Sequence, residues 1–299
     1  MRFMRIGVRG SERPVVVTPA GQLYDLSPVT PDIDGDFFAG DGIAKTRAAL
    51  STRSLRRIEA GKDRVGAPIA RPGAVVCLGA NYAAHAAESG MTPPAYPVVF
   101  FKHPNTVVGP FDEIRMPAGS EKLDWEVELA LVIGATAAGL RSDAEALDCI
   151  AGVTIANDVS ERAFQLEISG GQWSKGKSAP TFCPVGPALV PIDQIDDVQD
   201  LRLQSWVNGQ ARQDSSTADM IFSVATIVRE LSQVMTLDPG DLVLTGTPEG
   251  VALSGRFPYL VDGDTIEAGH RRPRRAAPAS DPRASRRGIR AGRLSRPRT

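Results

Sequence analysis

The sequence contains few cysteines and no long apolar run. Its three cysteines, Cys77, Cys149 and Cys183, are far apart and form no Cys-x-x-Cys pair, which argues against a disulfide framework and against a thiolate metal site. Because their neighbours are apolar, we expect three buried structural thiols. No apolar stretch approaches the roughly 20 residues of a membrane-spanning helix, and the N-terminus lacks the apolar segment and cleavage site of a signal peptide. The sequence therefore predicts a cytoplasmic protein without a membrane partner.

The chain also has almost no net charge, but its charges are unevenly distributed. The formal net charge is −1. Residues 270–299 contain eleven arginines and one acidic residue, which leaves 23 basic and 34 acidic residues in 1–269. An acidic body repels polyanions, so we expect no nucleic acid as a partner. An alternative is nucleic-acid binding by the tail, which would appear as salt-dependent binding that requires residues 270–299.

The pattern along the chain predicts an α+β protein that is mostly β, in three parts. Residues 1–72 form a small N-terminal α+β domain, with short strands within 1–10, 13–19 and 22–27 and a helix over 43–60, where Ile43, Leu50 and Leu55 have helical spacing. Residues 73–269 form a larger domain that begins after the punctuation at Pro72-Gly73. Residues 270–299 are rich in Arg, Pro, Ala, Ser and Gly, so we expect this tail to be disordered.

The larger domain alternates strands with a few helices. Strands are predicted within 74–80, 97–102, 125–134, 152–160, 187–192, 201–209 and 241–248. A helix is predicted to open at Asn81 as its N-cap, and a second lies over 142–150, with acids in its first turn. The third helix, over 223–235, is amphipathic. Its predicted apolar face consists of Val224, Ile227, Val228, Leu231 and Val234.

Two glutamates on one strand give the first indication of chemistry. In a strand, residues i and i+2 point to the same face, so Glu126 and Glu128 project side by side. Two such carboxylates repel each other unless a cation lies between them, and Mg²⁺ prefers carboxylate oxygens. Two exposed acids on an edge strand explain the pattern equally well. Asp158 ends the next apolar strand, where it is either a third ligand or, if it stands alone, a cap or turn residue.

Three further motifs carry ionisable or hydrogen-bonding groups. His85 and Glu88 lie three residues apart on a predicted helix, where a carboxylate fixes the imidazole tautomer and raises its basicity. Such a pair suits a general base, although surface His–Glu pairs are common. Lys177 lies in a Gly/Pro-bounded loop and suits an oxyanion or a carboxylate, although most loop lysines are merely solvated. Residues 244–250, with Thr247, offer hydroxyl and backbone N–H groups to an anion, or are simply a turn.

Taken together and in this order, seven motifs resemble the fumarylacetoacetate hydrolase (FAH) family over roughly residues 73–269. The motifs are GANYAAHAAE, FFKHPNTVVGP, DWEVELALVIG, ANDVSERAFQ, QWSKGKS, PTFCPVGP and TGTPEGV. Within the family, the chain is most similar to bacterial diketo-deoxy sugar acid hydrolases and to members called ureidoglycolate lyases.

The resemblance implies a fold, a partner and a set of site residues. The implied fold is a mixed β-sandwich or β-roll, usually in a homodimer. Glu126, Glu128 and Asp158 would bind Mg²⁺ or Mn²⁺, and the implied catalytic residues are His85, Glu88 and Lys177. The implied substrate-binding residues are Lys102, Arg162, Gln165 and Thr247.

The implied activity is hydrolysis of a C–C bond in a small 2,4-diketo acid, of the diketo-deoxy sugar acid or acylpyruvate type. The reaction passes through a metal-stabilised enolate. The free energy of forming this enolate is several kcal/mol lower when the metal acts as a Lewis acid. Oxaloacetate decarboxylation and isomerisation of an oxo-diacid use the same enolate and stay open as alternatives. A different alternative is an inactive member whose C-terminus is aberrant.

Three departures from the family pattern bear on these expectations. Ala179-Pro180-Thr181 stands where relatives often have Phe-Asp-Thr, which predicts a reshaped substrate end of the pocket. Ala80 stands where some acylpyruvase-like relatives carry arginine. After Glu267, relatives continue with a short strand and a Gly-rich ending, whereas this chain turns Arg-rich. Our hypothesis is that the tail is a frameshifted reading, which resequencing the coding end would test.

Overall fold

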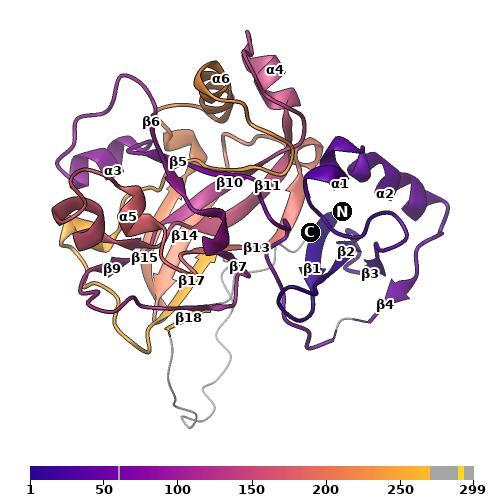
Figure 1. The fold of residues 1–299 in the computed structure, drawn as a ribbon, viewed down its shortest axis with the longest axis horizontal. Coiled ribbons are helices and arrows are strands. Elements are labelled where there is room, and N and C mark those ends of the chain that lie inside the picture. The colour runs from indigo at the N-terminus through magenta and orange to yellow at the C-terminus, as the bar shows by residue number, and fades with distance from the viewer. Residues whose placement is uncertain (60, 270–288, 293–299) are drawn as a thin grey trace.

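The protein is mostly β, as the sequence predicted (Figure 1). The computed structural model describes residues 1–59, 61–269 and 289–292. The predictions for 270–288 and 293–299, including most of the expected disordered tail, lie outside the described residues. Among the described residues, no helix has the length and apolar character needed to cross a membrane.

Most strands in the described part of the chain belong to one large mixed sheet. Its order is β4 (Arg57–Ile58), β3 (Leu23–Asp25), β2 (Arg13–Val17), β1 (Arg2–Ile6), β13 (Cys183–Pro191), β11 (Ile150–Asn157), β10 (Val127–Ile133), β16 (Leu242–Leu244), β5 (Val75–Gly79) and β6 (Val98–Lys102). The short β7 (Val107–Val108) also pairs with β13. Because β1 pairs with β13, the N-terminal strands extend the same sheet as the centre of the molecule (Figure 1). The division at residue 72 therefore stays a prediction.

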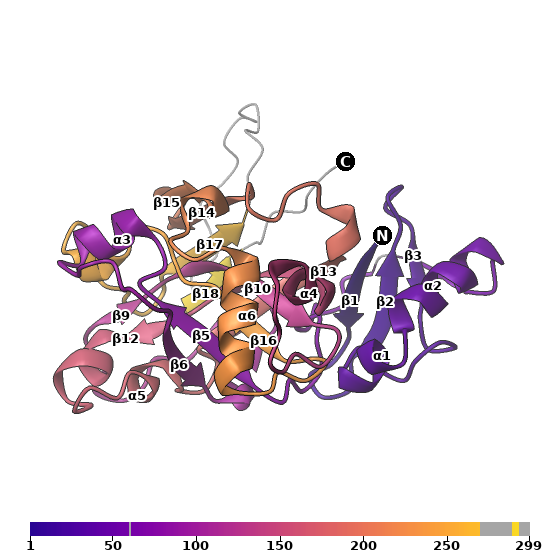
Figure 2. The same cartoon turned by 90° about the horizontal axis from the view of Figure 1, so that it is seen from above.

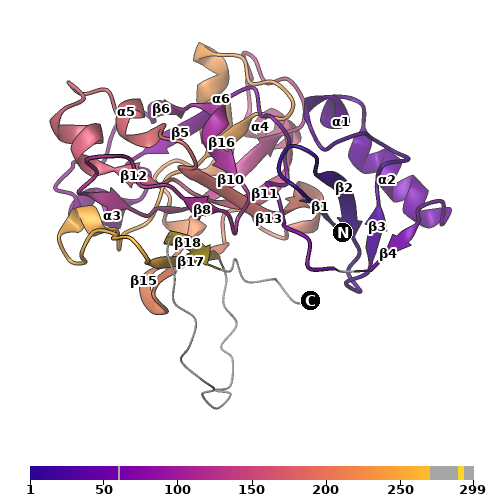
Figure 3. The same ribbon diagram turned by 60° about the horizontal axis from the view of Figure 1, so that its bottom comes forward.

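A second sheet and a strand pair lie beside the large sheet (Figure 3). The second sheet has the order β15 (Gln210–Ser216), β14 (Arg202–Val207), β17 (Thr265–Gly269), β18 (Ile289–Gly292) and β8 (Glu113–Ile114), and the pair consists of β9 (Leu123–Asp124) and β12 (Ser160–Glu161). The backbone of β18 pairs in parallel with β17 and antiparallel with β8. The prediction of a wholly disordered tail is therefore wrong at 289–292, because these residues occupy the strand position between β17 and β8.

Six α-helices and five short helical turns accompany the sheets in the described residues. They are α1 (Gly35–Ala39), α2 (Gly42–Ser51), α3 (Ala83–Glu88), α4 (Asp143–Asp148), α5 (Ser174–Lys177), α6 (Val224–Val234), η1 (Pro104–Thr106), η2 (Ala163–Glu167), η3 (Ile192–Gln194), η4 (Thr217–Asp219) and η5 (Ala252–Ser254). The α4 and α6 helices lie over one face of the large sheet near β10 (Figure 2).

Strand β10 is buried along its whole length because both of its faces are covered. Leu129, Leu131 and Ile133 pack against α4 and α6, whereas Ala130 and Val132 pack in the core on the other face. The period of two places Glu128 on the same face as Ala130 and Val132, away from α6. Glu128 is therefore buried on the face of the sheet opposite to α4 and α6.

The predicted helix over 43–60 is too long, since α2 ends at Ser51. Arg53 adopts a left-handed conformation with φ of 54°, which a helix cannot continue, and the chain then enters β4. Leu55 is nevertheless buried in the core. Helix α1 was not predicted at all, because its five residues are too few for a periodic signal.

The helix-cap predictions have mixed outcomes. Ser142 caps α4 by accepting a hydrogen bond from Glu145 N, which the sequence did not predict, although a helix was expected over 142–150. Asn81 is not the N-cap of α3, because Tyr82 occupies that position. The Asn81 amide instead donates to Thr245 O at 2.8 Å and accepts from Phe222 N at 2.8 Å, which joins three loops.

The remaining fold predictions concern apolar side chains. The amphipathic helix is confirmed as α6, with Val224, Ile227, Val228 and Leu231 buried, but Val234 is exposed because it lies in the last turn before the helix ends. The three cysteines are free thiols and buried, as expected.

An ion-pair network joins the N-terminal strands to the rest of the molecule. The Arg64 guanidinium donates to Glu12 at 2.7 Å and to Asp112 at 2.6 Å, and Arg5 lies 3.3 Å from the same Glu12 carboxylate. Burial raises the pKa of Glu12, but the hydrogen bond from Arg64 and neighbouring charges together lower it by a larger amount. The net pKa therefore lies below the usual 4.5. Ionised Glu12 therefore stabilises the folded state above about pH 4.5, and this contribution is lost as the pH falls through the lowered pKa.

We expect Arg64→Met to lower the free energy of unfolding by about 1–3 kcal/mol at pH 7, since it removes charge-assisted hydrogen bonds to partly buried carboxylates. The difference from the unmodified chain should shrink below pH 4.5, where Glu12 takes up a proton. Urea unfolding at several pH values measures both effects. The control is Arg56→Met, whose side chain is 73% exposed beside Asp25 and should contribute about 0.5 kcal/mol or less. Equal losses for the two variants would contradict this assignment.

Candidate active site

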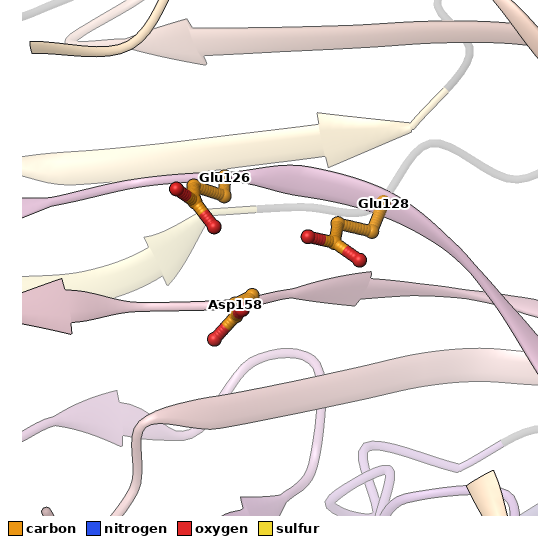
Figure 4. Close-up of side chains that lie close together, drawn as sticks. All are labelled: Glu126, Glu128 and Asp158. Atoms are coloured by element: carbon orange, nitrogen blue, oxygen red, sulfur yellow. The ribbon is translucent and has the colours of Figure 1, made fainter. Parts of the chain in front are cut away.

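Three carboxylates from β10 and the end of β11 meet inside the molecule (Figure 4). Glu126 directly precedes β10, Glu128 lies in β10, and Asp158 directly follows β11. Each offers an oxygen, and these oxygens all lie within 4.8 Å of one another. The exposed fractions are 4%, 1% and 0%, and β10 is a central strand. The alternative of two exposed acids on an edge strand is therefore excluded.

Antiparallel pairing of β10 with β11 brings Asp158 to the glutamates. Val127 is paired with Asn157, and Asp158 N donates to Glu126 O at 2.9 Å. The Asn157 side chain accepts a hydrogen bond from Glu126 N at 3.0 Å, which fixes the chain just before β10. The two strand ends are thus joined by their backbones, and the carboxylates lie close together as a consequence of this register.

Two buried lysines contact the carboxylate cluster. Lys177 Nζ lies 2.6 Å from Glu126 Oε2 and 2.9 Å from Asp158 Oδ2. Lys102 Nζ lies 2.6 Å from Asp158 Oδ1 and 3.1 Å from Val159 O. Within the described residues, Glu128 has a different kind of partner, since its Oε2 accepts a hydrogen bond from Gly246 N at 2.8 Å. Among the described residues, ammonium groups therefore contact Glu126 and Asp158 directly, whereas none contacts Glu128.

The pKa values within the cluster follow from this uneven compensation. Burial raises the pKa of Glu126, but the charges of Arg162 and Lys177 lower it by a larger amount. The net pKa therefore lies well below the usual range. Burial raises the pKa of Glu128, and the charges of Asp158 and Glu126 raise it more. Burial lowers the pKa of Lys177, whereas the charges of Asp158 and Glu126 raise it above its usual value, so the ammonium stays protonated. A further positive charge beside Glu128 would favour its ionised form.

A second set of contacts organises the guanidinium of Arg162. It donates to Asp124 Oδ2 at 2.8 Å, to Gln165 Oε1 at 2.9 Å and to Glu126 Oε1 at 2.6 Å. Asp124 is fully buried and also accepts hydrogen bonds from the backbone N–H groups of Ala252 and Leu253. Asp124 was not among the predicted site residues, and it positions Arg162 against Glu126.

The predicted His85–Glu88 pair forms on α3. His85 Nδ1 lies 3.1 Å from Glu88 Oε1, and Gly250 N donates to the same carboxylate at 3.0 Å. His85 is 5% exposed and lines a pocket, so its second ring nitrogen is left for a ligand or a water molecule. The pair is therefore an internal one and not the surface pair that the sequence also allowed.

One pocket of about 310 Å³ brings most of the predicted residues together. It is lined by His85, Glu88, Glu126, Arg162, Gln165, Lys177 and Thr247, together with apolar residues. Glu128, Asp158 and Lys102 are not among the lining residues, and Lys102 contacts Asp158 within the buried cluster. The hydroxyl of Thr247 donates to Val127 O at 2.9 Å and accepts from Gln213 Nε2 at 2.8 Å, so it is used within the protein. Ala80 lines the pocket, whereas residues 179–181 do not, so the predicted reshaping by 179–181 has no direct support.

Most of the chain matches a known protein family. The profile of the family described as fumarylacetoacetate (FAA) hydrolase C-terminal matches residues 74–273. The chain belongs to this family. The family predicted from the seven motifs is thereby confirmed.

Individual relatives of the FAH family agree with the fold and differ in their reactions. A Burkholderia multivorans protein, named only as a hydrolase, is 44% identical over 272 residues, or 90% of this chain and 95% of that protein. The 2-hydroxyhepta-2,4-diene-1,7-dioate isomerase of Mycobacterium marinum is 36% identical with a TM-score of 0.65, covering 89% and 92% of the two chains. Maleylpyruvate hydrolase from Sphingobium sp. SYK-6, solved with manganese(II) and pyruvate, is 29% identical with a TM-score of 0.72, covering 89% and 93%.

The carboxylate cluster of this FAH-family chain fits a hard divalent cation. All three candidate ligands are oxygens, which Mg²⁺ and Mn²⁺ prefer, and no sulfur or imidazole ligand competes within the cluster. Glu128 is the buried carboxylate for which the described residues provide no cationic partner, so a bound cation would favour its ionised form.

Proposed function

We propose that the chain is a divalent-metal-dependent hydrolase that cleaves a C–C bond of a small 2,4-diketo acid. The observation that carries this proposal is the buried cluster of Glu126, Glu128 and Asp158 beside a pocket that also contains the His85–Glu88 pair. Mg²⁺ or Mn²⁺ would be held by these three carboxylates. When bound, the cation would supply a Lewis acid that stabilises the negative charge of an enolate.

The chain's own residues would bind the substrate and move the protons. Water adds to the 4-carbonyl, the bond between C3 and C4 breaks, and C3 takes up a proton, which yields pyruvate and a carboxylic acid. His85, oriented by Glu88, is placed to accept the proton of water at its second ring nitrogen, a role that contributes typically 10²–10⁴-fold to the rate. Lys177 and Arg162 would offset the substrate's negative charge, with Gln165 and Thr247 in the pocket wall and Lys102 holding Asp158.

A panel of 2,4-diketo acids, assayed for pyruvate release with Mg²⁺ or Mn²⁺ and with EDTA, tests the proposal directly. Turnover that requires the cation would support it. Metal-independent turnover, or no turnover on any oxo-acid by metal-loaded protein, would refute it. The latter result would favour the inactive alternative. The homodimer stays a prediction, and light scattering on the purified protein would check it.

Isomerisation of an oxo-diacid is the second candidate, because a solved isomerase is 36% identical to this chain. Isomerisation moves a proton without cleaving a C–C bond and therefore releases no pyruvate. Ultraviolet absorbance of an unsaturated oxo-diacid, followed in parallel with pyruvate release, separates the two reactions. Oxaloacetate decarboxylation, which also yields pyruvate, is recognised by the release of carbon dioxide.

Glu88→Gln is expected to lower kcat about tenfold to a hundredfold, since the amide keeps the shape of Glu88 but loses the charge that supports His85. Binding of Mn²⁺ should be unchanged because Glu88 is not a candidate ligand. Steady-state kinetics and calorimetric Mn²⁺ titration measure the two effects. Glu121→Gln, at an exposed glutamate outside the pocket, is the matched control and should keep its activity. Loss of Mn²⁺ binding in Glu88→Gln would contradict the assigned role.

A further inference from the structure

Part of the pocket lining is apolar. It consists of Leu78, Met91, Phe100, Leu166, Trp173 and Leu253. These residues come from β5, β6, η2, η5 and two loops, so the apolar surface is assembled by the fold and not by one segment. Leu166 is 44% exposed, which places it where the pocket meets solvent.

An aromatic wall gives this apolar part a fixed shape. A Cβ on Gly79 would lie 2.4 Å from the ring of Trp173, so only glycine permits the observed approach of this indole to β5. Trp173 also meets Phe100 edge-on, with ring centroids 5.7 Å apart. The Lys177 ammonium lies 5.0 Å from the centroid of the Phe100 ring. The wall therefore begins directly beside the ammonium that contacts the carboxylate cluster.

Each cationic or imidazole group that lines the pocket, among the described residues, already has a carboxylate partner. Arg162 contacts Asp124 and Glu126, and Lys177 contacts Glu126 and Asp158. His85 contacts Glu88. A 2-oxo acid brings one carboxylate of its own, which these groups and a bound cation would share. A second carboxylate at the other end of the substrate would lie against this apolar lining without a cationic partner among the described pocket residues, which is unfavourable.

We propose that the acyl end of the substrate is uncharged and apolar, so that the enzyme prefers an alkyl acylpyruvate to a dicarboxylate of the same length. This inference rests on the proposed function and narrows its substrate class. A preference for alkyl substrates would distinguish the chain from the solved Mycobacterium marinum isomerase, whose name gives a dioate as its substrate. Each added methylene of the substrate would strengthen binding by packing against the apolar lining. A distal carboxylate would find no partner, because the cations are already paired.

Two substrates of equal length test the preference in the metal-loaded enzyme. Hydrolysis of 2,4-dioxoheptanoate breaks C3–C4, with hydroxyl added to C4 and a proton to C3, and yields pyruvate and butanoate. The same reaction of 2,4-dioxoheptanedioate yields pyruvate and succinate. We expect kcat/KM to favour the first by about a hundredfold or more. In the alkyl series, each added methylene should raise kcat/KM roughly fourfold until the pocket is filled.

A variant at the pocket mouth supplies the missing cation. Leu166→Arg should raise the kcat/KM of the dicarboxylate relative to the alkyl substrate by about tenfold or more, because it offers a counter-charge. Leu166→Met is the volume-matched comparison and should keep the original preference. An equal or reversed preference in the unmodified enzyme would overturn the inference, while cleavage of both substrates would leave the proposed function standing.

A binding measurement gives a second result that does not depend on cleavage. The compounds 2-oxoheptanoate and 2-oxoheptanedioate lack the 4-carbonyl and cannot undergo the reaction. Calorimetry with Mn²⁺-loaded protein should show tighter binding of 2-oxoheptanoate. Equal or tighter binding of the dioate would overturn the inference even if no diketo acid were cleaved, whereas the expected order combined with absent turnover would refute only the proposed function.

Discussion

Glu128→Gln is expected to lower kcat/KM by roughly a thousandfold or more. A Lewis-acid cation contributes several kcal/mol to stabilising an enolate, and each 1.36 kcal/mol corresponds to a factor of ten in rate. Glutamine keeps the size of Glu128 and can still accept the hydrogen bond from Gly246 N. The variant therefore removes one ligand charge and little else. Assays over a range of Mn²⁺ concentrations measure the loss.

Thermal unfolding separates this effect from damage to the fold. A cation that binds the folded state stabilises it by about 2.7 kcal/mol at a hundred times its Kd. We expect this Mn²⁺-induced rise in Tm in the unmodified chain and its absence in Glu128→Gln. In EDTA the variant should be as stable as the unmodified chain or more so. The substitution removes a buried carboxylate that lies close to the carboxylates of Glu126 and Asp158.

Asp241→Asn is the matched control for a buried carboxylate. Asp241 is 5% exposed and accepts hydrogen bonds from Ala74 N and Asp238 N, outside the cluster. This variant should lower Tm and keep the Mn²⁺-induced rise. If Glu128→Gln kept that rise as well, the carboxylate cluster would not be the metal site.

The elements that sequence could predict are those with a strong local pattern. Strand β10 is a continuous apolar run and α6 has a clear apolar face, and both are where the pattern placed them. Helix α2 was predicted too long because a left-handed Arg53 leaves no mark in the spacing of apolar residues. Asn81 has the chemistry of a cap, but its contacts to Thr245 and Phe222 come from loops distant in sequence.

The site divides in the same way between local and tertiary information. The two-residue period of a strand predicted that Glu126 and Glu128 lie on the same face. The same spacing extends to Asp124, which could have been found from the sequence. The place of Asp158 depends on the register between β10 and β11, which sequence alone left open. The family resemblance supplied the grouping of these residues. The apolar wall of Trp173 against Gly79 is a contact between distant segments, and no local pattern indicated it.

Lys177→Met is expected to have the opposite metal dependence to Glu128→Gln. The Lys177 ammonium is 2% exposed and compensates both Glu126 and Asp158. Removing one partner of a buried ion pair costs about 3–5 kcal/mol, because the remaining charges lose their compensation. The variant should therefore unfold at a much lower temperature in EDTA than the unmodified chain.

A divalent cation should restore much of that stability, since it supplies positive charge to the same carboxylates. The Mn²⁺-induced rise in Tm is thus expected to be larger in Lys177→Met than in the unmodified chain. Turnover should stay low even at saturating Mn²⁺, because the charge that Lys177 offers to the substrate is missing. Lys175→Met, two residues away in the short helix α5, is the control and should change stability by about 0.5 kcal/mol or less. A smaller Mn²⁺ response in Lys177→Met than in the unmodified chain would show that the cation and the ammonium do not serve the same carboxylates.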